Sequence, residues 1–337
     1  MKVGIIGCGK RFTNIYSYIL KSLKYEVFLW NRTRQKSIEI SQKENFNHVE
    51  SIQDFQKIRP DVILCFIPSQ AHFDIVNQIQ NISCKILFET PGEDVRITSM
   101  KNIGVLEQWP KLPLEQFKEI IYSSELISRP YMVQNDGRSF DYHAMAQLRK
   151  YLNFANPVVT KGSVKSYPNL GQLDNQNKLN TTPHEWTIGQ IEMSNGSLLL
   201  YNFAYNCKSL SSIPIQLLRA YSSDGCIVTG RMKQLGNDYE HIDIRYVNKS
   251  TKETIFANVH VEKTGNTIAS LSIENERIVW KNPYSHLNFD DQQIAMASLI
   301  DDAIKEKTYS YQNAYIDNAC INMIKQAGFQ QQVLTVR

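Results

Sequence analysis

The sequence predicts an α/β protein with two domains, a doubly wound parallel sheet in residues 1–118 and an α+β domain with a large open, mostly antiparallel sheet in residues 119–337. Three observations predict this fold. Short apolar runs alternate with helical patterns in the first part of the chain, strand-like segments separated by turns follow after residue 155, and two helical patterns close the chain. A chain of 337 residues, 42% of them hydrophobic, is long enough to bury about two cores.

The N-terminal part alternates strands and helices as a parallel sheet requires. Its apolar runs are short and uninterrupted, as in strands buried on both faces, and the first segment between them repeats Ile15, Ile19 and Leu23 at helical spacing. Strands are expected at 2–7, 25–31, 61–67, 84–89 and 103–109, and helices at 8–23, 33–44, 51–58 and 70–80.

The C-terminal part has the texture of an antiparallel sheet. Its strand-like segments are separated by turn pairs such as Asn195-Gly196 and Asp224-Gly225. Strands are expected at 157–167, 185–193, 196–206, 214–222, 225–232, 240–248, 254–262 and 277–281, and helices at 290–307 and 311–329, the second capped by Gly328.

Composition excludes several classes of function. The net charge of +4 is spread without a basic block, which argues against nucleic-acid binding. The longest apolar runs are too short to cross a bilayer, so no membrane association and a cytoplasmic location are expected. The six cysteines contain no CxxC pair, so neither a zinc site, nor any other metal site, nor a disulfide framework is expected.

A glycine turn follows the first strand and predicts a Rossmann-type dinucleotide site. In Gly7-x-Gly9 the first glycine permits a tight turn and the second lets a pyrophosphate approach the backbone at a helix start, with Lys10 and Arg11 next to it. Phe12 stands where the usual fingerprint has a third glycine. A plain strand-to-helix turn stays open as the alternative, although the position at the first strand of a βα pattern favours cofactor binding.

The end of the second strand indicates which dinucleotide binds. A site specific for NAD normally carries Asp or Glu here, whereas this chain has neutral Asn31 followed by Arg32, Thr33 and Arg34. Two guanidiniums and a hydroxyl suit a ribose phosphate, so NADP(H) is predicted as the preferred cofactor, with NAD(H) also possible. The alternative is that both arginines are solvated residues at a helix start.

Gly7-x-Gly9, "PSQAHFDIV" at 68–76 and "ILFETP" at 86–91 resemble the corresponding motifs of the glucose-fructose oxidoreductase and inositol dehydrogenase (Gfo/Idh/MocA) family. The C-terminal strands and the closing helix resemble that family too. The resemblance implies an NAD(P)-dependent oxidoreductase that binds a sugar or nucleotide sugar between the nicotinamide and the open sheet, and a homo-oligomer, a dimer or tetramer, joined through that sheet. It also places Pro68, His72 and Glu89 at the cofactor pocket.

The catalytic motif departs from the family pattern. Where the family carries Glu-Lys-Pro, this chain has Glu89-Thr90-Pro91, and Thr90 can donate a hydrogen bond but carries no charge. The family's Asp and His stand four residues apart, whereas Asp141 lies two residues before His143. Three assignments stay open: His143 as acid/base, Tyr142 as proton donor, or Asp141 as the group that orients His143, against the alternative of a helix cap beside a packed Tyr-His pair.

The remaining candidates would contact the substrate. They are Gln108, Trp109, Arg138 and Lys165. Trp109 is alternatively a packing residue between domains, and Arg138 an ordinary exposed arginine. The leading hypothesis is hydride transfer between NADP(H) and a sugar or nucleotide-sugar carbonyl or alcohol. A nucleotide-binding sensor or partner protein without turnover, and a redox-assisted lyase or epimerase, are the alternatives.

Overall fold

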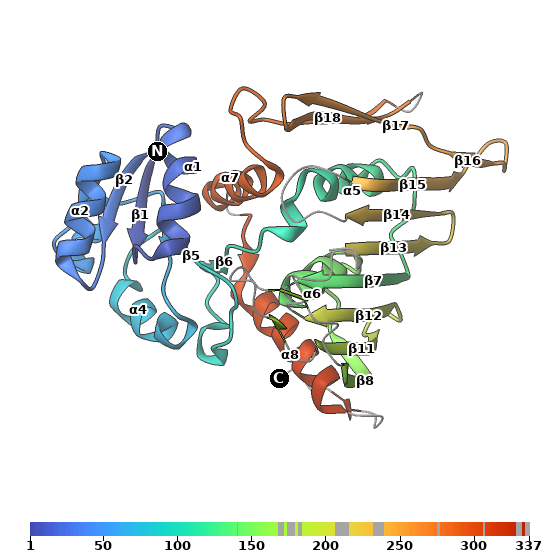
Figure 1. Cartoon of the computed structure of the whole chain (residues 1–337), viewed down its shortest axis with the longest axis horizontal. Coiled ribbons are helices and arrows are strands. Elements are labelled where there is room, and N and C mark those ends of the chain that lie inside the picture. Colours follow the sequence, from blue (N-terminus) through green and yellow to red (C-terminus); the bar gives the residue numbers. More distant parts are fainter. Residues whose placement is uncertain are drawn as a thin grey trace. The chain divides into compact units, whose positions relative to one another are not determined.

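The computed structural model describes residues 1–139, 141–167, 172–173, 179–180, 184–205, 216–231, 239–274, 277–305, 307–327 and 332–333 (Figure 1). The chain forms two compact units, Met1–Leu112 with Gln292–Ile316, and Pro113–Asp291 with Asp317–Arg337. The segment 292–316 therefore groups with residues 1–112. The predicted fold class, a parallel sheet followed by a large and mostly antiparallel sheet, is confirmed.

A seven-stranded sheet forms the centre of the first unit, in the order β20-β6-β5-β4-β1-β2-β3. Its strands are β1 (Lys2–Ile6), β2 (Glu26–Trp30), β3 (Asn47–His48), β4 (Val62–Cys65), β5 (Lys85–Phe88), β6 (Ile103–Val105) and β20 (Tyr309–Ser310). Neighbours from β6 to β3 pair in parallel, and the short β20 is antiparallel to β6. The order reverses between β1 and β4, where open α/β sheets bind ligands beyond the carboxyl ends of their strands.

Helices connect these strands, and those expected at 8–23, 33–44, 51–58 and 70–80 are present. They are η1 (Phe12–Tyr16), α1 (Ser17–Ser22), α2 (Arg34–Glu44), η2 (Ile52–Asp54), α3 (Phe55–Ile58), η3 (Ser69–Ala71), α4 (His72–Ile79), η4 (Val95–Ile97), η5 (Trp109–Lys111) and α7 (Asp291–Ile304). The side chains of β4 are fully buried, which explains its uninterrupted apolar sequence. The strand expected at 103–109 ends at Val105, and Trp109–Lys111 form the short turn η5 instead.

A nine-stranded sheet forms the centre of the second unit, in the order β16-β15-β14-β13-β7-β12-β11-β8-β21. Its strands are β7 (Met132–Ser139), β8 (Pro157–Tyr167), β11 (His184–Met193), β12 (Leu198–Tyr205), β13 (Gln216–Ser222), β14 (Gly225–Arg231), β15 (Tyr239–Val247), β16 (Thr254–Phe256) and β21 (Gln332–Val333). The β7-β12 pair is parallel and the other pairs are antiparallel.

Two features of this unit were not predicted. The central strand β7 was not predicted, because its polar residues Gln134, Asn135 and Asp136 interrupt the alternation of apolar and polar residues that is typical of a strand. The segment expected as one strand at 254–262 is divided between β16 and a separate three-stranded sheet, which consists of β17 (Val259–Thr264), β18 (Thr267–Ile273) and β19 (Ile278–Lys281). A further small sheet pairs β9 (Gln172–Leu173) with β10 (Leu179–Asn180).

Helices α5 (Pro113–Ser123) and α6 (Asp141–Tyr151) cover one face of the large sheet. Lys118 of α5 donates to Thr229 of β14 at 2.8 Å, and Gln216 of β13 donates to Gln147 of α6. Thr229 and Gln216 point to the same side because Thr229 is paired with Leu218, which stands two residues after Gln216 on β13. Residues directly opposite Thr229 along the ladder, Leu218 and Asn135, therefore also face these helices.

The last helix, α8 (Tyr311–Ala327), lies close to the edge of this sheet. A Cβ added to Gly162 or Gly189 would come within 2.5 or 2.7 Å of Ile324, so these two glycines let the helix approach β8 and β11. The predicted C-cap, Gly328, lies outside the described residues. None of the described helices is long and apolar enough to cross a membrane.

Candidate functional site

The glycine turn at the carboxyl end of β1 has the conformation that a dinucleotide site requires. Gly7 has φ of +90°, and a Cβ placed on it would lie 2.7 Å from the backbone oxygen of Phe66. A Cβ on Gly9 would meet nothing within 4 Å. Gly7 is therefore needed for the turn itself, whereas Gly9 leaves the backbone open to a ligand beside the switch point of the sheet.

The residues after this turn divide between surface and core. Arg11 is partly exposed, and its Nε donates to Oε1 of Glu89 at 3.0 Å, which ties the turn to the end of β5. Phe12 is fully buried, with its ring centroid 5.5 Å from that of Phe66. Phe12 therefore fills the space between helix and sheet that a third glycine would leave, and its side chain is not available to a cofactor. Lys10 is exposed.

Asn31 connects the glycine turn to the segment after β2. Its Oδ1 accepts from the backbone N–H of Cys8 at 3.2 Å, and its Nδ2 donates to the backbone oxygen of Thr33 at 3.1 Å. Thr33 then stands at the N-cap position of α2 and is exposed. The amide thus holds together the two backbone segments that the sequence assigned to the phosphates and the ribose of a dinucleotide.

The two arginines of this segment differ in their partners. Within residues 1–139 the exposed Arg32 side chain makes no hydrogen bond or ion pair, while Arg34 binds both oxygens of Glu50, at 2.7 and 2.6 Å. The hydrogen bonds from Arg34 lower the pKa of Glu50 to about 2, so the carboxylate is charged. Both arginines were predicted to bind a ribose phosphate. Arg34 is already paired with Glu50, so only Arg32 has a side chain available for that contact.

Two residues near this segment were missed by sequence reasoning. Glu50 follows β3, and the parallel pairing of β3 with β2 brings it to Arg34 although they are 16 residues apart. Burial raises the pKa of the Cys8 thiol, and the ammonium of Lys36 lowers it, so Lys36 lies within electrostatic reach of the glycine turn. Lys36 lies inside α2 whereas Arg32 precedes the N-cap Thr33, so no helical spacing in the sequence linked the two.

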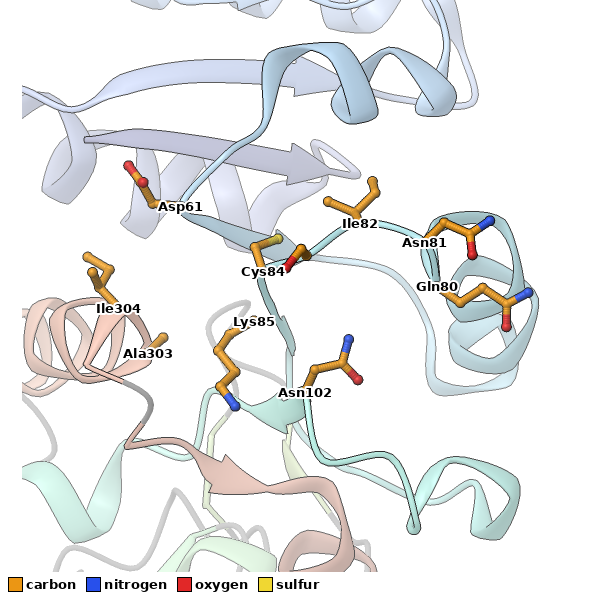
Figure 2. A pocket seen from close by; sticks show the side chains of 10 residues that line it. Asp61, Gln80, Asn81, Ile82, Cys84, Lys85, Asn102, Ala303 and Ile304 are labelled. Carbon is orange, nitrogen blue, oxygen red and sulfur yellow. The ribbon is translucent and has the colours of Figure 1, made fainter.

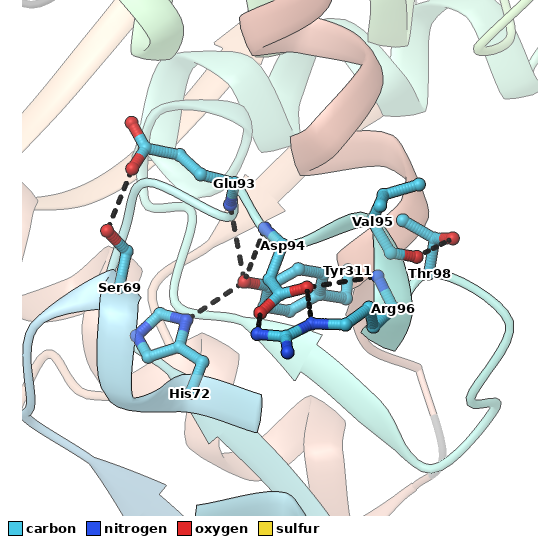
Figure 3. A network of polar contacts seen from close by, with 8 residues as sticks. All are labelled: Ser69, His72, Glu93, Asp94, Val95, Arg96, Thr98 and Tyr311. Atoms are coloured by element: carbon cyan, nitrogen blue, oxygen red, sulfur yellow. Dashed lines mark hydrogen bonds and ion pairs between the residues drawn. The ribbon is translucent and has the colours of Figure 1, made fainter. Parts of the chain in front are cut away.

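His72 is a structural residue of the first unit. It is 1% exposed, and its Nδ1 lies 2.9 Å from the hydroxyl of Tyr311 (Figure 3). Its Nε2 lies 3.3 Å from the backbone oxygen of Ile67. The tyrosine hydroxyl also accepts from the backbone N–H groups of Glu93 and Asp94, at 3.2 and 3.3 Å. The hydroxyl proton is then directed to Nδ1, which leaves the proton of the neutral ring on Nε2, facing Ile67.

Burial also lowers the pKa of His72 to about 4, so the ring is neutral near pH 7. The network holds the loop that carries Glu89, Thr90 and Pro91 against the first turn of α8. Pro68, which precedes η3, is exposed, and Thr90 is partly exposed. The histidine therefore shapes the surroundings of Thr90 without offering an acid.

Gln108 and Trp109 are buried, at 5% and 4% exposure. The backbone N–H of Trp109 donates to Oε1 of Glu107 at 3.1 Å, and the Trp109 ring belongs to the core of its unit. The side-chain oxygen of Gln108 is buried and has no hydrogen-bond partner in the described part of the chain. A buried amide oxygen without a partner is costly, and a ligand or water donor would satisfy it.

The acid/base candidates stand at the start of α6. His143 is 4% exposed, and its ring centroid lies 4.4 Å from that of Tyr142, which is partly exposed. Asp141 pairs with Lys325 of α8 at 2.7 Å and accepts from the backbone N–H of Tyr142 at 3.0 Å. Asp141 is the first residue of α6, and its carboxylate anchors the helix start to α8.

Arg138 and Lys165 lie in one cross-strand row of the large sheet. The row runs from Arg138 through Ala204 and Trp186 to Lys165, on strands β7, β12, β11 and β8. Residues directly opposite one another on paired strands share a face of the sheet. Along one strand the faces alternate, so Arg138, three positions after Asn135, points away from the helices that Asn135 faces. The two cations therefore lie on the face opposite to α6, and the structure does not bring them together with His143.

The structure also has a groove that is separate from the cofactor turn. A groove of about 580 Å³ lies at the amino ends of β4, β5 and β6, where Asp61, Lys85 and Asn102 line it (Figure 2). Ligands of open α/β sheets bind at the opposite, carboxyl ends. Among the described residues, no group of three or more His, Cys, Asp or Glu side chains is placed to hold a metal ion.

Solved structures resemble this chain over nearly its whole length. An NAD binding oxidoreductase from Klebsiella pneumoniae has a TM-score of 0.69 at 10% identity, with 100% of this chain and 99% of that chain covered. The chain has the fold of such oxidoreductases. Levoglucosan dehydrogenase in complex with NADH and L-sorbose gives 0.68 at 12% identity, with 99% of both chains covered.

A third similar structure, UDP-N-acetylglucosamine 3-dehydrogenase from Acidithiobacillus ferrooxidans, has a TM-score of 0.60 at 11% identity, with 98% of this chain and 99% of that chain covered. No protein-family model and no curated protein sequence matches the chain. At these identities the likeness shows the fold, and the chemistry has to be argued from the residues of this chain.

Proposed function

We propose that this protein is an NAD(P)-dependent oxidoreductase that prefers NADP(H) and transfers hydride between the nicotinamide and a sugar or nucleotide-sugar carbonyl or alcohol. The observation that carries the proposal is the glycine turn. Gly7 needs its positive φ, and Gly9 leaves open backbone at the point where the strand order reverses. The same turn joins Asn31 on one side and, through Arg11, Glu89 on the other.

The residues of this turn fit a dinucleotide. The pyrophosphate would lie at Gly9 and the helix start that follows, where free N–H groups and the helix dipole favour an anion. Arg32 and Thr33 are exposed and would meet the ribose phosphate. A bound nicotinamide supplies the hydride donor or acceptor, and the protein contributes orientation and a proton donor.

The similar structures support the substrate class. One is a dehydrogenase of levoglucosan seen with NADH and L-sorbose, and another acts on UDP-N-acetylglucosamine. The buried oxygen of Gln108, which has no partner among the described residues, suits the hydroxyl groups of such substrates.

His143 is proposed as the acid/base, with Tyr142 as the alternative proton donor and Thr90 donating a hydrogen bond to the substrate oxygen. Asp141 has the supporting role of fixing the helix start, since its carboxylate is bound to Lys325 and to the backbone N–H of Tyr142. Replacing His143 by Ala should lower kcat at least a hundredfold, as expected for a general acid/base. Tyr142→Phe tests the alternative proton donor, and near-normal turnover of His143→Ala would remove His143 from the acid/base role.

The experiment that tests the cofactor site is a fluorescence titration with NADPH and with NADH. Wild type, Asn31→Asp and Arg32→Ala are compared. Tighter NADPH binding that weakens in both variants supports the proposal, because an aspartate repels the ribose phosphate and alanine removes a guanidinium. No binding of either nucleotide at micromolar concentration would contradict it.

A second candidate function follows from Thr90. Without the lysine, the chain would bind the dinucleotide as a sensor or partner protein, or use a tightly held cofactor in a lyase or epimerase reaction. Tight nucleotide binding without turnover on any sugar favours the sensor. A cofactor that copurifies and does not exchange favours the lyase or epimerase.

Self-association through the large sheet is also proposed. The face opposite to α5 and α6 exposes Ile188 of β11 by 46% and Phe256 of β16 by 65%. Such apolar residues on an open sheet face support a dimer or tetramer. Sedimentation of wild type and Ile188→Lys tests this, and a monomeric wild type would contradict it.

A further inference from the structure

Three cations follow β2 at alternate positions. Arg32, Arg34 and Lys36 are all exposed, and each carries a positive charge that a phosphate would attract. Their surroundings differ. Within residues 1–139, the side chains of Arg32 and Lys36 make no hydrogen bond or ion pair, whereas Arg34 makes two hydrogen bonds to one carboxylate.

That carboxylate belongs to Glu50. It binds Nε of Arg34 at 2.7 Å and Nη2 at 2.6 Å, which is the bidentate geometry that a phosphate would otherwise use. His48 contributes a third group, with its Nε2 3.5 Å from the same carboxylate. The parallel pairing of β3 with β2 places Glu50 beside the start of α2, so the position of the charge is set by the fold.

We propose that Glu50 is a specificity-determining residue for the cofactor, which limits the preference for NADPH over NADH by occupying Arg34 and by placing a negative charge beside the ribose site. The proposal rests on the proposed function, because it requires a dinucleotide at the glycine turn. The ribose 2'-phosphate carries a charge that Glu50 repels, whereas the 2'-hydroxyl of NADH carries none. Glu50 therefore acts on one cofactor more than on the other.

The three cations therefore differ in whether they can bind the ribose phosphate. Arg32 and Lys36 remain available to the phosphate, because within residues 1–139 neither side chain makes a hydrogen bond or ion pair. Arg34 contributes only after its partner is removed. Neutralising Glu50 should therefore add a third cation and remove one anion in a single substitution.

The test compares Glu50→Gln with Glu44→Gln. Glu44 is the last residue of α2, the helix that begins with Arg34, and it pairs with Lys21 at 3.1 Å. It lies roughly 15 Å along α2 from Arg34. Each variant therefore removes one negative charge from the same part of the surface, but only Glu50→Gln removes the partner of Arg34. Dissociation constants for NADPH and NADH are measured by nicotinamide fluorescence at low salt and at about 1 M salt, and thermal melts verify folding.

Glu50→Gln should bind NADPH about fivefold more tightly at low salt, with less gain at high salt, while its affinity for NADH does not increase. Glu44→Gln should leave the ratio of the two constants within about twofold of wild type. Arg34→Gln should weaken NADPH more than NADH, because Glu50 then remains without its partner.

An unchanged ratio in a folded Glu50→Gln protein, or an equal gain for both nucleotides, overturns the role of Glu50 and leaves the dinucleotide site intact. If wild type, Glu50→Gln and Glu44→Gln bind neither nucleotide, the proposed function itself fails and the role of Glu50 fails with it. The two failures are therefore distinguishable in one set of titrations.

Discussion

The glycine turn of the first unit and the start of α6 in the second unit are both candidate sites, and they are specified in different ways. At Gly7 the backbone conformation excludes every side chain, because φ is +90° and a Cβ would meet a backbone oxygen. At α6 the roles of Asp141, Tyr142 and His143 depend on side-chain partners from elsewhere in the fold. A binding turn can thus be identified from its backbone conformation alone, whereas a proton donor can be identified only when the side chains around it are known.

The largest effect is expected at the turn and separates the two glycines. Gly7→Ala should destabilise the protein by about 4 kcal/mol, because a strained φ is combined with a contact to the Phe66 oxygen. Gly9→Ala should fold normally, since its Cβ meets nothing within 4 Å, but it should lose nucleotide affinity by crowding the pyrophosphate. Chemical denaturation and fluorescence titration of both variants measure this difference, and equal stability of the two would break the comparison.

The next effect tests how α6 is held. Arg149 is fully buried and pairs with Asp317 of α8 at 2.6 Å. Arg149→Ala should cost about 3 kcal/mol in the free energy of unfolding, because the buried carboxylate of Asp317 loses this partner. Urea denaturation measures the loss. The partly exposed Lys150 next to it in the helix provides the control, and a similar loss in Lys150→Ala would show that the ion pair is not the cause.

A pH effect of intermediate size is expected from His72. The pKa is about 4 in the folded protein and about 6.5 in an unfolded chain, so the unfolded chain binds the proton first as the pH falls. The free energy of unfolding should therefore decrease by about 2.5 kcal/mol between pH 7 and pH 4.5 through this residue. His72→Asn should be less stable at neutral pH and show a smaller decrease, and the same slope in both proteins would contradict the assignment.

The smallest effect concerns the tyrosine that holds the Glu-Thr-Pro loop. Tyr311→Phe removes the acceptor of the Glu93 and Asp94 N–H groups and the donor to His72, which should cost about 1.5 kcal/mol. If the loop positions Thr90, kcat should also fall while the affinity for the nucleotide stays the same. Tyr315→Phe, on the same helix, is the control, and unchanged kcat would limit Tyr311 to stability.

Sequence reasoning predicted the parallel sheet and its glycine turn because both depend on local patterns, an uninterrupted apolar run and a glycine pair. It missed the central strand β7, where Asp136 accepts from Asn202 of β12 and pairs with Arg219 of β13, contacts that only the assembled sheet provides. The pairing of Arg34 with Glu50 and the separation of Arg138 from His143 also depend on strand register, which no single segment contains.

The most direct test of the central claim is a redox assay of wild type with NADP⁺ and with NAD⁺ across a panel of sugars, cyclitols and nucleotide sugars, following the absorbance of the reduced nicotinamide. The predicted result is substrate-dependent reduction of NADP⁺ by at least one member of the panel, lost in His143→Ala. Nucleotide binding without reduction by any member would contradict the claim and show that the chain has the fold of an oxidoreductase without its chemistry.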